Sequence, residues 1–420
     1  MKKYNLIVVG GGLSGVAAAV AGAREGLSVL IIESTGSLGG ALTDQLVFPF
    51  MPFYVNDSKT GEIKYLSDGL FRKMCLAQSE FENKTVPFEK EFKKEYFKII
   101  LDQMVCEASI EVLFHSVMYD VKMSGRKIDK ILVATTLGKT EFGADFFVDA
   151  TGDGNLLALA GCEYLLGREK DNLCQPMTTC FDVCGVDLEQ FHKDRTKLQE
   201  LYKQKQQKGE ISNPRENILT FEGLGEGVLH FNTTRVVKHN PTDPFEVSRA
   251  EIIARKQIFE MYSFLRENSK AFEHSTLVNS ANHIGVRESR KLVGEYVLQT
   301  EDLINCVDFP DTIALGMYPI DIHNPEGTGT TMYHLKDGEY YRIPYRCLVP
   351  KEIDNMLVAG RNLSATHEAH SAVRIMPICC CMGEAAGTAI GHAYNTDKNV
   401  HTVDIQEVRN KLKNYGAAIE

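Results

Sequence analysis

The sequence predicts an α/β fold in which a parallel sheet with a β-meander is interrupted by a second, α+β domain. Three observations indicate this fold. Residues 3–33 read as a strand, a glycine turn, a helix, a second strand and a closing acid. Residues 111–142 read as a meander of short strands, the last at 139–142, with Gly125 and Gly138 at turns, and they lead into a strand at 144–149. Residues 355–393 read as a buried strand followed by a helix of small residues.

The opening segment is organised around Gly10, Gly12 and Gly15, which fit the pattern G-x-G-x-x-G. Residues 6–9 before them are apolar and β-branched, as in a buried parallel strand. The first glycine allows a tight turn, the second lets a pyrophosphate approach the backbone, and the third lets the helix that follows pack on the strand. The N-terminus of that helix would present N–H groups to phosphates. Glu33 ends the next strand, where an acid can accept hydrogen bonds from ribose hydroxyls. The pattern predicts a dinucleotide site and does not choose between NAD and FAD.

Two later motifs bear on that choice. Gly39 and Gly40 stand just past the acid. In two-domain flavoproteins such a pair lets the backbone lie against the ribityl chain and the flavin ring, although an ordinary glycine loop would also explain it. Residues 144–154 read as a strand ending in DATGDG, which places small residues where the backbone passes close to a cofactor. In isolation this motif is also a strand-to-helix turn with Asp153 as a cap.

Length, composition and charge exclude several classes of protein. At 420 residues the chain is long enough for two to three domains or for one large interrupted domain. Its net charge of −10 argues against a general nucleic-acid binder, whose affinity would come from neutralising phosphates. No apolar run approaches the roughly 20 residues of a membrane span. We therefore expect neither nucleic acid nor membrane as a partner.

The eleven cysteines show no metal-binding pattern. No C-x-x-C occurs, and no Cys/His spacing resembles a zinc ribbon or a ferredoxin, so we predict no metal site. Residues 2–9 faintly imitate a signal peptide, but the apolar run is too short and glycines follow at once. Reduced thiols without a secretory signal indicate the cytoplasm.

The remaining segments are read mainly from their hydrophobic spacing. Residues 42–54 are apolar and aromatic with two prolines, and they either wall a substrate pocket or belong to the core. Helical spacing appears at 69–80 and 89–108, and 187–209 reads as a polar helix. Residues 245–269 read as an amphipathic helix. Its predicted apolar stripe contains Ile252, Ile253, Lys256, Phe259, Tyr262, Phe264 and Leu265.

The set of motifs resembles the glutathione-reductase-type two-domain flavoproteins. The C-terminal part is more specific: residues 358–377, which contain VAGRNLSATH, and residues 383–391 resemble the bacterial family of FAD-dependent oxidoreductases, FAD_oxidored. Residues 285–296 and 343–350 resemble the same family. The glycine pattern by itself is generic, whereas the ordered set is specific and spans nearly the whole chain.

This resemblance implies a Rossmann-like FAD-binding domain formed by residues 1–160 and 342–420. A substrate-binding or capping domain, residues 161–341, would interrupt it. The FAD would be noncovalent, and NAD(P)H could serve as an external electron donor. The helix predicted at 378–393 would direct its N-terminus at the edge of the flavin where negative charge grows on reduction.

The resemblance also implies which residues hold the cofactor. They come from the glycine turn, the acid and its neighbours, the DATGDG turn and the C-terminal segment. The expected FAD-binding residues are Gly10, Gly12, Leu13, Ser14, Gly15, Glu33, Ser34, Gly39, Gly40, Ala41, Val117, Ala150, Thr151, Gly152, Asp153, Gly360, Arg361, Arg374 and Met376.

Candidate catalytic residues are polar groups near the expected flavin ring. His323, within a strand-like stretch at 311–323, is the first choice for a general acid or base because an ordinary histidine titrates near neutral pH. His367 and His370 precede the C-terminal helix, and either could meet the ring or be structural. Arginines could clamp a carboxylate, or pair with nearby acids. These arginines are Arg287, Arg290, Arg346 and Arg374, of which Arg287 and Arg374 are the preferred candidates.

The expected function is an FAD-dependent oxidoreductase that transfers a hydride between a small organic substrate and flavin N5. The alternative is a flavin-binding subunit of a larger electron-transfer or tRNA-modifying complex. A disulfide reductase is disfavoured because residues 39–44 contain no cysteine and only one clear G-x-G-x-x-G occurs. A homo-oligomer is compatible with the sequence, and the substrate and electron acceptor stay open.

Overall fold

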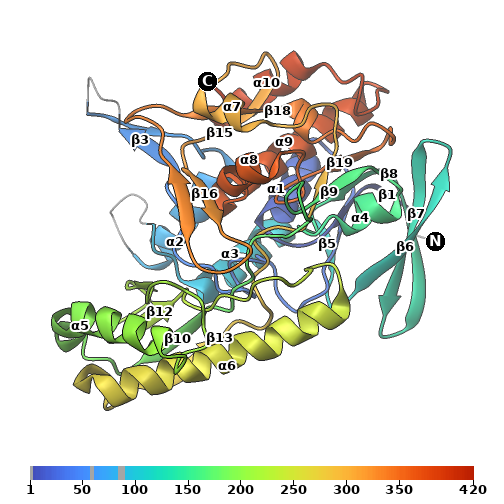
Figure 1. Ribbon diagram of the computed structural model, residues 1–420. Helices are drawn as coiled ribbons and strands as arrows, with labels where there is room; N and C mark the ends of the chain where they lie inside the picture. The colour runs from blue at the N-terminus through green and yellow to red at the C-terminus, as the bar shows by residue number, and fades with distance from the viewer. Residues whose placement is uncertain (1–2, 57–60, 84–89) are drawn as a thin grey trace.

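The computed structural model describes residues 3–56, 61–83 and 90–420, and within them the central element is a seven-stranded sheet (Figure 1). Strand β1 (Lys3–Val9) pairs in parallel with β2 (Val29–Ile32) on one side and with β8 (Gly138–Asp149) on the other. β2 continues to β5 (Glu111–Leu113), and β8 pairs in parallel with β19 (Met356–Val358). Strands from both ends of the chain therefore share one sheet, which confirms the predicted α/β class.

The β-meander forms the other part of this sheet. β6 (Val117–Ser124), β7 (Lys127–Thr135) and the first half of β8 pair antiparallel. The sequence predicted two short pieces at 139–142 and 144–149, but β8 is one continuous strand. Gly143 explains the difference, because it pairs with the meander on one side and with β1 on the other. One strand therefore serves both halves of the sheet.

Two helices of small residues pack against each other next to the sheet. They are α1 (Leu13–Arg24) and α9 (Met376–Asn395), the blue and red helices at the centre of Figure 1. A Cβ on Gly383 would lie 2.1 Å from the carbonyl oxygen of Ser14, and one on Gly387 would lie 2.1 Å from that of Ala18. The glycines thus let two backbones approach so closely that no side chain fits between them.

No single helix within the described residues is long and apolar enough to cross a membrane. Helices α8 (His367–Val373) and α9 pass that test only as a pair, and the chain bends by 91° between them. Most residues of both helices are buried in the protein core.

A second, smaller sheet lies at the bottom of Figure 1, and we name it the capping sheet because it falls within the predicted capping domain. Its strand order is β11 (Thr220–Phe221), β12 (Leu229–Phe231), β10 (Phe181–Cys184) and β13 (Thr276–Ser280). Helices α5 (Leu188–Gln207) and α6 (Pro244–Asn268) pack with this sheet around a separate apolar cluster. In that cluster the rings of Phe181 and Phe231 stack with their centroids 4.6 Å apart.

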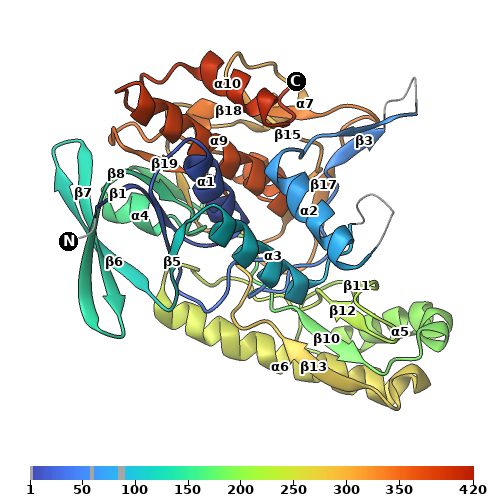
Figure 2. The ribbon, with the colours of Figure 1, turned by 180° about the vertical axis from the view of Figure 1, so that it is seen from behind.

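The other elements connect these two units. Seen from behind, α3 (Lys94–Glu107) lies between α1 and the capping sheet (Figure 2), and Lys94 forms an ion pair with Asp182 of β10 at 3.0 Å. The remaining elements are β3 (Tyr54–Asn56), β4 (Ile63–Tyr65), α2 (Leu70–Phe81), α4 (Asn155–Leu159), β9 (Tyr164–Leu166), the 3₁₀ helix Lys270–Phe272, β14 (Arg290–Leu292), α7 (Thr300–Ile304), β15 (Thr312–Gly316), β16 (Ile320–His323), β17 (Thr330–Tyr333), β18 (Tyr341–Pro344), the 3₁₀ helix Tyr345–Cys347 and α10 (Ile405–Asn414).

Several sequence-based boundaries differ from the structure. The strand expected across 311–323 is two strands, β15 and β16, which pair with β18 and β17 respectively. Pro319 lies between them, and proline cannot donate a ladder hydrogen bond. The helix expected at 89–108 begins at Lys94, and residues 84–89 lie outside the described residues. The domain boundary at 161–341 stays a prediction.

The apolar stripe predicted for α6 is partly wrong. Phe264 and Leu265 are buried, but Ile252 is 65% and Phe259 72% exposed. The buried face is instead completed by smaller or more flexible residues. These are Ala250, Ala254, Gln257, Ile258 and Met261. Choosing the largest apolar side chains therefore misplaced the buried face, because alanines at helical spacing also mark it.

This difference gives a stability test. We expect Phe264→Ala to lower the free energy of unfolding by about 3–5 kcal/mol, because it opens a cavity beside the capping sheet. Phe259→Ala removes the same ring from an exposed position and should change stability by less than about 0.5 kcal/mol. Urea unfolding midpoints of the two variants check this, and equal losses would contradict the assignment of the buried face.

Candidate functional site

The glycine turn lies at the carboxyl end of β1. A Cβ on Gly10 would lie 2.4 Å from the carbonyl oxygen of Ala150, and one on Gly15 would lie 1.9 Å from the carbonyl oxygen of Gly10. A Cβ on Gly12 would meet no protein atom within 4 Å. Gly12 is also the N-cap of α1, and no side chain caps that helix end. The turn is therefore closed on its protein side and open in front of the helix N-terminus, where a phosphate would approach.

Glu33 and the glycine pair lie beside this turn. One carboxylate oxygen of Glu33 accepts a hydrogen bond from the N–H of Gly11 at 2.6 Å, and the other accepts one from Thr35 at 2.7 Å. The N–H of Gly39 donates to the carbonyl oxygen of Gly11 at 2.8 Å. Gly40 lies so close to Gly12 that a Cβ on it would be 3.0 Å from the Gly12 Cα. The structure thus brings the predicted glycines and acid together.

Val117 also lies near the acid. The N–H of its neighbour Ser116 donates to the backbone carbonyl of Glu33 at 2.9 Å, and the Val117 side chain is 51% exposed. A residue more than 80 positions away from Glu33 therefore lies at the same edge of the sheet.

The DATGDG turn is organised by Asp149 rather than by a cap at Asp153. The Asp149 carboxylate accepts hydrogen bonds from the N–H and hydroxyl of Thr151, at 3.0 and 2.7 Å, and from the N–H of Leu157 at 2.8 Å. Burial raises its pKa above the ordinary range. Asp153 instead forms an ion pair with Arg361 at 2.7 Å. The first acid shapes the turn, and the second joins it to the C-terminal segment.

The C-terminal segment closes over the start of α1. A Cβ on Gly360 would lie 2.7 Å from the hydroxyl of Ser14. Among the described residues, three buried polar atoms of this segment have no hydrogen-bond partner: Asn362 Oδ1, His370 Nδ1 and Arg374 Nε. An unpartnered buried polar atom costs on the order of 1–3 kcal/mol. The C-terminal segment therefore has buried polar atoms for which the described residues supply no hydrogen-bond partner.

His370 has a defined protonation state. Its Nε2 lies 2.7 Å from the carbonyl oxygen of Arg361, so that nitrogen must carry the hydrogen and donate. Burial lowers the pKa of His370 well below its ordinary value. The ring is therefore neutral, and its Nδ1 keeps a lone pair.

His367 lies in a separate buried ion cluster. Its Nδ1 is 2.8 Å from the carboxylate of Glu288, which also pairs with Lys291. Both Glu288 and Lys291 are fully buried. Burial opposes ionisation of Glu288, but the hydrogen bond with His367 and the charge of Lys291 outweigh it and lower the pKa of Glu288 to about 2. This cluster fixes His367 as a structural partner of Glu288.

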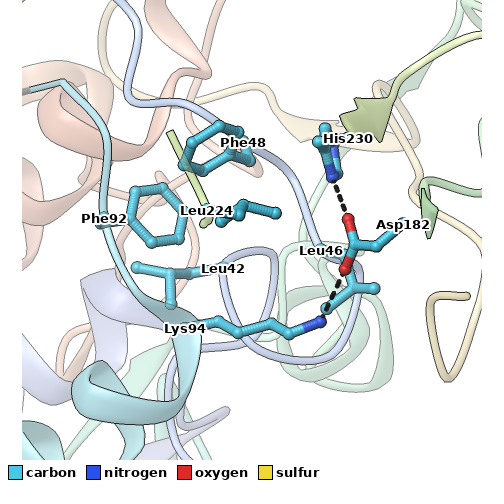
Figure 3. A pocket seen from close by; sticks show the side chains of 8 residues that line it. All are labelled: Leu42, Leu46, Phe48, Phe92, Lys94, Asp182, Leu224 and His230. Carbon is cyan, nitrogen blue, oxygen red and sulfur yellow. Dashed lines mark hydrogen bonds and ion pairs between the residues drawn. The ribbon is translucent and has the colours of Figure 1, made fainter. Parts of the chain in front are cut away.

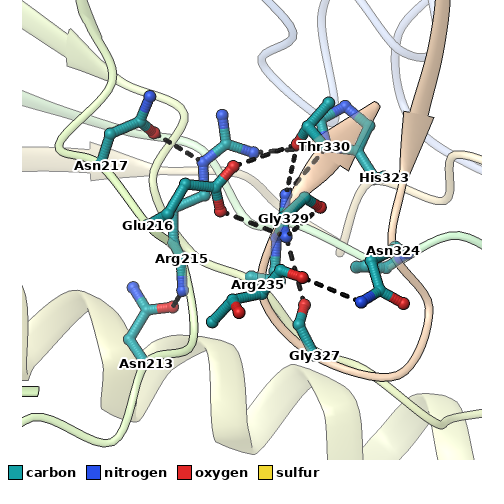
Figure 4. Close-up of polar contacts among 12 residues, drawn as sticks. Asn213, Arg215, Glu216, Asn217, Arg235, His323, Asn324, Gly327, Gly329 and Thr330 are labelled. Atoms are coloured by element: carbon teal, nitrogen blue, oxygen red, sulfur yellow. Dashed lines mark hydrogen bonds and ion pairs between the residues drawn. The ribbon is translucent and has the colours of Figure 1, made fainter. Parts of the chain in front are cut away.

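His323 lies at the end of β16 within a group of arginines (Figure 4). Its Nδ1 is 3.0 Å from the guanidinium of Arg235 and 3.5 Å from that of Arg215, so it accepts from cations. Its Nε2 is 3.2 Å from the carboxylate of Asp321. Burial and the nearby Arg287 lower the pKa of His323 to about 3. The reason for choosing His323 as a general acid or base does not hold, because both ring nitrogens are engaged and the ring is neutral at pH 7.

The other candidate arginines divide into two groups. Arg290 donates to the carbonyl oxygen of Asp153 at 3.1 Å, and Arg346 forms an ion pair with Asp311 at 3.0 Å. Arg287 and Arg374 belong instead to the surroundings of His323, because both lower its pKa. The structure thus separates the two preferred arginines from the other two.

Sequence analysis missed a small, mostly apolar pocket between residues 42–48 and the capping sheet, with Asp182, His230 and Lys94 as its polar residues (Figure 3). There His230 Nδ1 is 2.7 Å from Asp182, and His230 Nε2 is buried without a partner among the described residues. The ring of Phe48 lies 5.4 Å from that of His230. Residues 42–54, interpreted from the sequence as either a pocket wall or part of the core, contribute to both. Phe48 lines this pocket, whereas Phe50 and Phe53 are buried in the main core. No local spacing connects His230 with Asp182, so only the strand pairing reveals the site.

Among the described residues, no group of three or more His, Cys, Asp or Glu side chains is arranged to hold a metal ion. All eleven cysteines are free.

Comparison with known proteins identifies the class. A family model described as FAD dependent oxidoreductase matches residues 5–412, and the chain belongs to that family. It is an oxidoreductase with FAD as its cofactor. No curated protein matches the chain.

Solved structures with a similar fold are distant in sequence. The anhydrotetracycline hydroxylase OxyS from Streptomyces rimosus is 11% identical with a TM-score of 0.47, and the match covers 94% of this chain but only 63% of OxyS. A geranylgeranyl bacteriochlorophyll reductase-like protein from Thermoplasma acidophilum is 11% identical with a TM-score of 0.47, over 99% of this chain and 84% of that one. The flavin-dependent brominase Bmp2 is 12% identical with a TM-score of 0.47, over 98% and 83%.

The residues of the site fit FAD. The open space in front of Gly12 would receive the pyrophosphate, and the Glu33 carboxylate has lone pairs left for a ribose. The unpartnered atoms of Asn362 and His370 would meet the polar edge of a flavin. The first turn of α9 contains Pro377, whose missing N–H costs nothing there, and no side chain caps that helix. The FAD-binding roles of these residues are predictions, based on how their geometry and chemistry fit the cofactor.

Proposed function

We propose that this protein transfers a hydride between a small organic substrate and N5 of its FAD. The observation that carries the proposal is the meeting of β16 and the C-terminal segment: the N–H of Asp321 on β16 donates to the hydroxyl of Ser371 on α8 at 3.0 Å. This contact brings β16, which contains His323, next to α8, where His370 and the C-cap residue Arg374 each have a buried atom without a partner among the described residues. Bound FAD supplies the redox chemistry, and the protein supplies orientation and charge.

The side chains at this junction hold Asp321 in place. The hydroxyl of Tyr318 donates to Asp321 Oδ2 at 2.9 Å, and His323 Nε2 lies 3.2 Å from the same oxygen. Burial opposes the ionisation of Asp321, yet the hydrogen bond with His323 and the charge of Arg374 keep its pKa below the ordinary range. Tyr341 anchors the same corner, because its single O–H lies between the carbonyl oxygens of Tyr318 and Ala372, at 3.2 and 3.1 Å, and is shared between these two acceptors. In this proposal His323 is a positioning residue.

The test begins with the absorbance spectrum of the purified protein, followed by anaerobic reduction with NADH or NADPH. We expect a flavin spectrum. Bleaching by a nicotinamide assigns NAD(P)H as the electron donor, whereas a flavin that ignores both nicotinamides identifies an oxidase or a dehydrogenase. A colourless protein that gains no flavin absorbance when FAD is added would refute the proposal. The free cysteines support a reducing compartment, the cytoplasm, as the place of action.

One observation favours the alternative of a flavin-binding subunit. Phe245, Ile252 and Phe259 follow one another at intervals of seven along α6, and each is at least 65% exposed. An exposed apolar row of this kind is suited to a partner. Light scattering on the purified protein discriminates between the candidates. A monomer that turns over substrate by itself favours the enzyme, and a stable partner without turnover favours the subunit or, for a second copy, a homo-oligomer.

A further inference from the structure

The four arginines around His323 form one cluster, defined here as Arg215, Arg235, Arg287 and Arg374. Arg215 and Arg235 are 5% and 1% exposed and contact His323 directly. Arg287 donates to the carbonyl oxygen of Pro176 at 2.7 Å, next to Gln175, whose side-chain oxygen lies 3.5 Å from the N–H of His323. Arg374 ends α8, three residues after Ser371, which bonds to Asp321.

The cluster holds more positive than negative charge. Its carboxylates among the described residues are Asp321 and Glu216, the latter paired with Arg235 at 3.2 Å. Because His323 is neutral at pH 7, four guanidinium groups face two carboxylates. Burial and the neighbouring arginines lower the pKa of Arg287 to about 9 and that of Arg235 to about 10. The protein thus maintains an electrostatic cost that an entering anion would relieve.

The four arginines do not have the same freedom. Arg235 is held by the carbonyl oxygens of Gly327 and Gly329, at 3.2 and 3.0 Å, in the loop between β16 and β17 (Figure 4). Arg374 and Arg287 are only half-buried, and within the described part of the chain Arg374 Nε has no partner. Arg235 is therefore held by the protein itself. Arg287 donates from Nη1 to Pro176 and Thr178. Its Nη2 lies 3.5 Å from Asn232, so Arg287 offers fewer free donors than Arg374.

We propose that Arg287 and Arg374 bind a small dicarboxylate, so that the organic substrate of the proposed hydride transfer is a dicarboxylic acid. That the dicarboxylate is the substrate rests on the proposed function. That Arg287 and Arg374 bind a dicarboxylate rests on the arginine cluster alone. The excess of two positive charges matches a dianion. The guanidinium groups of Arg287 and Arg374 come from separate segments, the loop before β14 and the end of α8. Each planar guanidinium suits one planar carboxylate. A single phosphate, being compact, would pair with only one of the two guanidinium groups.

The experiment measures binding without turnover. Malonate, succinate, acetate and inorganic phosphate are titrated into the FAD-loaded protein at constant ionic strength, and the flavin difference spectrum reports binding. We expect saturable binding of one or both dicarboxylates. In Arg374→Gln the dissociation constant should rise at least about tenfold, the loss of one charged hydrogen bond. Arg249→Gln, which removes an exposed charge on α6, should bind like the wild type.

A second readout does not depend on flavin. A dicarboxylate should raise the thermal midpoint of the FAD-free wild type and of Arg249→Gln, but not that of Arg374→Gln. The proposal is overturned if no dicarboxylate binds, if phosphate binds more tightly than either, or if Arg374→Gln binds like the wild type. Loss of FAD from Arg374→Gln would assign that arginine to the cofactor and overturn it too.

The two readouts also separate this inference from the proposed function. If the protein binds a dicarboxylate but takes up no flavin, the arginine site is supported and the proposed hydride transfer is refuted. Conversely, if an uncharged substrate reduces the flavin and no dicarboxylate binds, the proposed oxidoreductase is supported and the dicarboxylate site is refuted.

Discussion

Gly12→Ala should lose FAD without losing the fold. A Cβ at this position meets no protein atom within 4 Å, and its backbone, at φ −65° and ψ 175°, is one that alanine adopts readily. The methyl group would instead occupy the space in front of α1, where the pyrophosphate must approach the N–H groups. We expect the affinity for FAD to fall by about 100-fold, which corresponds to about 2.8 kcal/mol. The stability of the FAD-free protein should change by less than about 1 kcal/mol.

Two further glycine variants make this prediction specific. Gly15→Ala places a Cβ 1.9 Å from the carbonyl oxygen of Gly10, so it should lower both the thermal midpoint of the FAD-free protein and FAD affinity. Gly225→Ala, whose Cβ would be 3.6 Å from the nearest atom of Val228, should change neither. Flavin fluorescence on FAD titration and thermal unfolding of the FAD-free variants are the measurements. Wild-type affinity in Gly12→Ala would place the phosphates elsewhere.

The geometry of the glycine turn could be predicted from the sequence because its signals are local. Gly10, Gly12 and Gly15 lie within six residues, and each has a separate steric reason to be glycine or to leave space. The joining of the two chain halves was also predictable. β1 and β19 both read as short apolar strands followed by glycine, and each pairs with β8.

The catalytic candidates could not be resolved in the same way, because their properties come from burial and from distant partners. An isolated histidine titrates near neutral pH, whereas His323 is packed against Arg235, which is 88 positions away. The pairing of His367 with Glu288 spans 79 positions. Neither pairing has a spacing that the sequence could reveal. The preference for Arg287 and Arg374 stays a prediction, and the charges of both lower the pKa of His323.

Glu288→Gln should be the most destabilising of the conservative substitutions at the buried ion cluster. Glu288 is 0% exposed, accepts the N–H of Gln175 at 3.0 Å, and pairs with both Lys291 and His367. Replacing it with glutamine leaves the ammonium of Lys291 buried without a counter-charge, which costs about 3–5 kcal/mol. Glu288→Gln combined with Lys291→Met removes both charges and should recover part of the loss. Glu295→Gln, which breaks a more exposed pair with His401, should cost less than about 1 kcal/mol.

The pH dependence provides a second, independent signature of the same group. The pKa of Glu288 is lowered from 4.5 to about 2 in the folded protein, so its contribution to stability is complete above about pH 4.5 and is lost as the pH falls toward 2. The difference amounts to roughly 3 kcal/mol. We therefore expect thermal unfolding at fixed FAD concentration to show a steeper loss of stability across this window in the wild type than in Glu288→Gln. Parallel curves, with equal midpoints at pH 7, would mean that this carboxylate is protonated in the native protein, and that the cluster joining the loop before β14 to α8 is held by neutral hydrogen bonds.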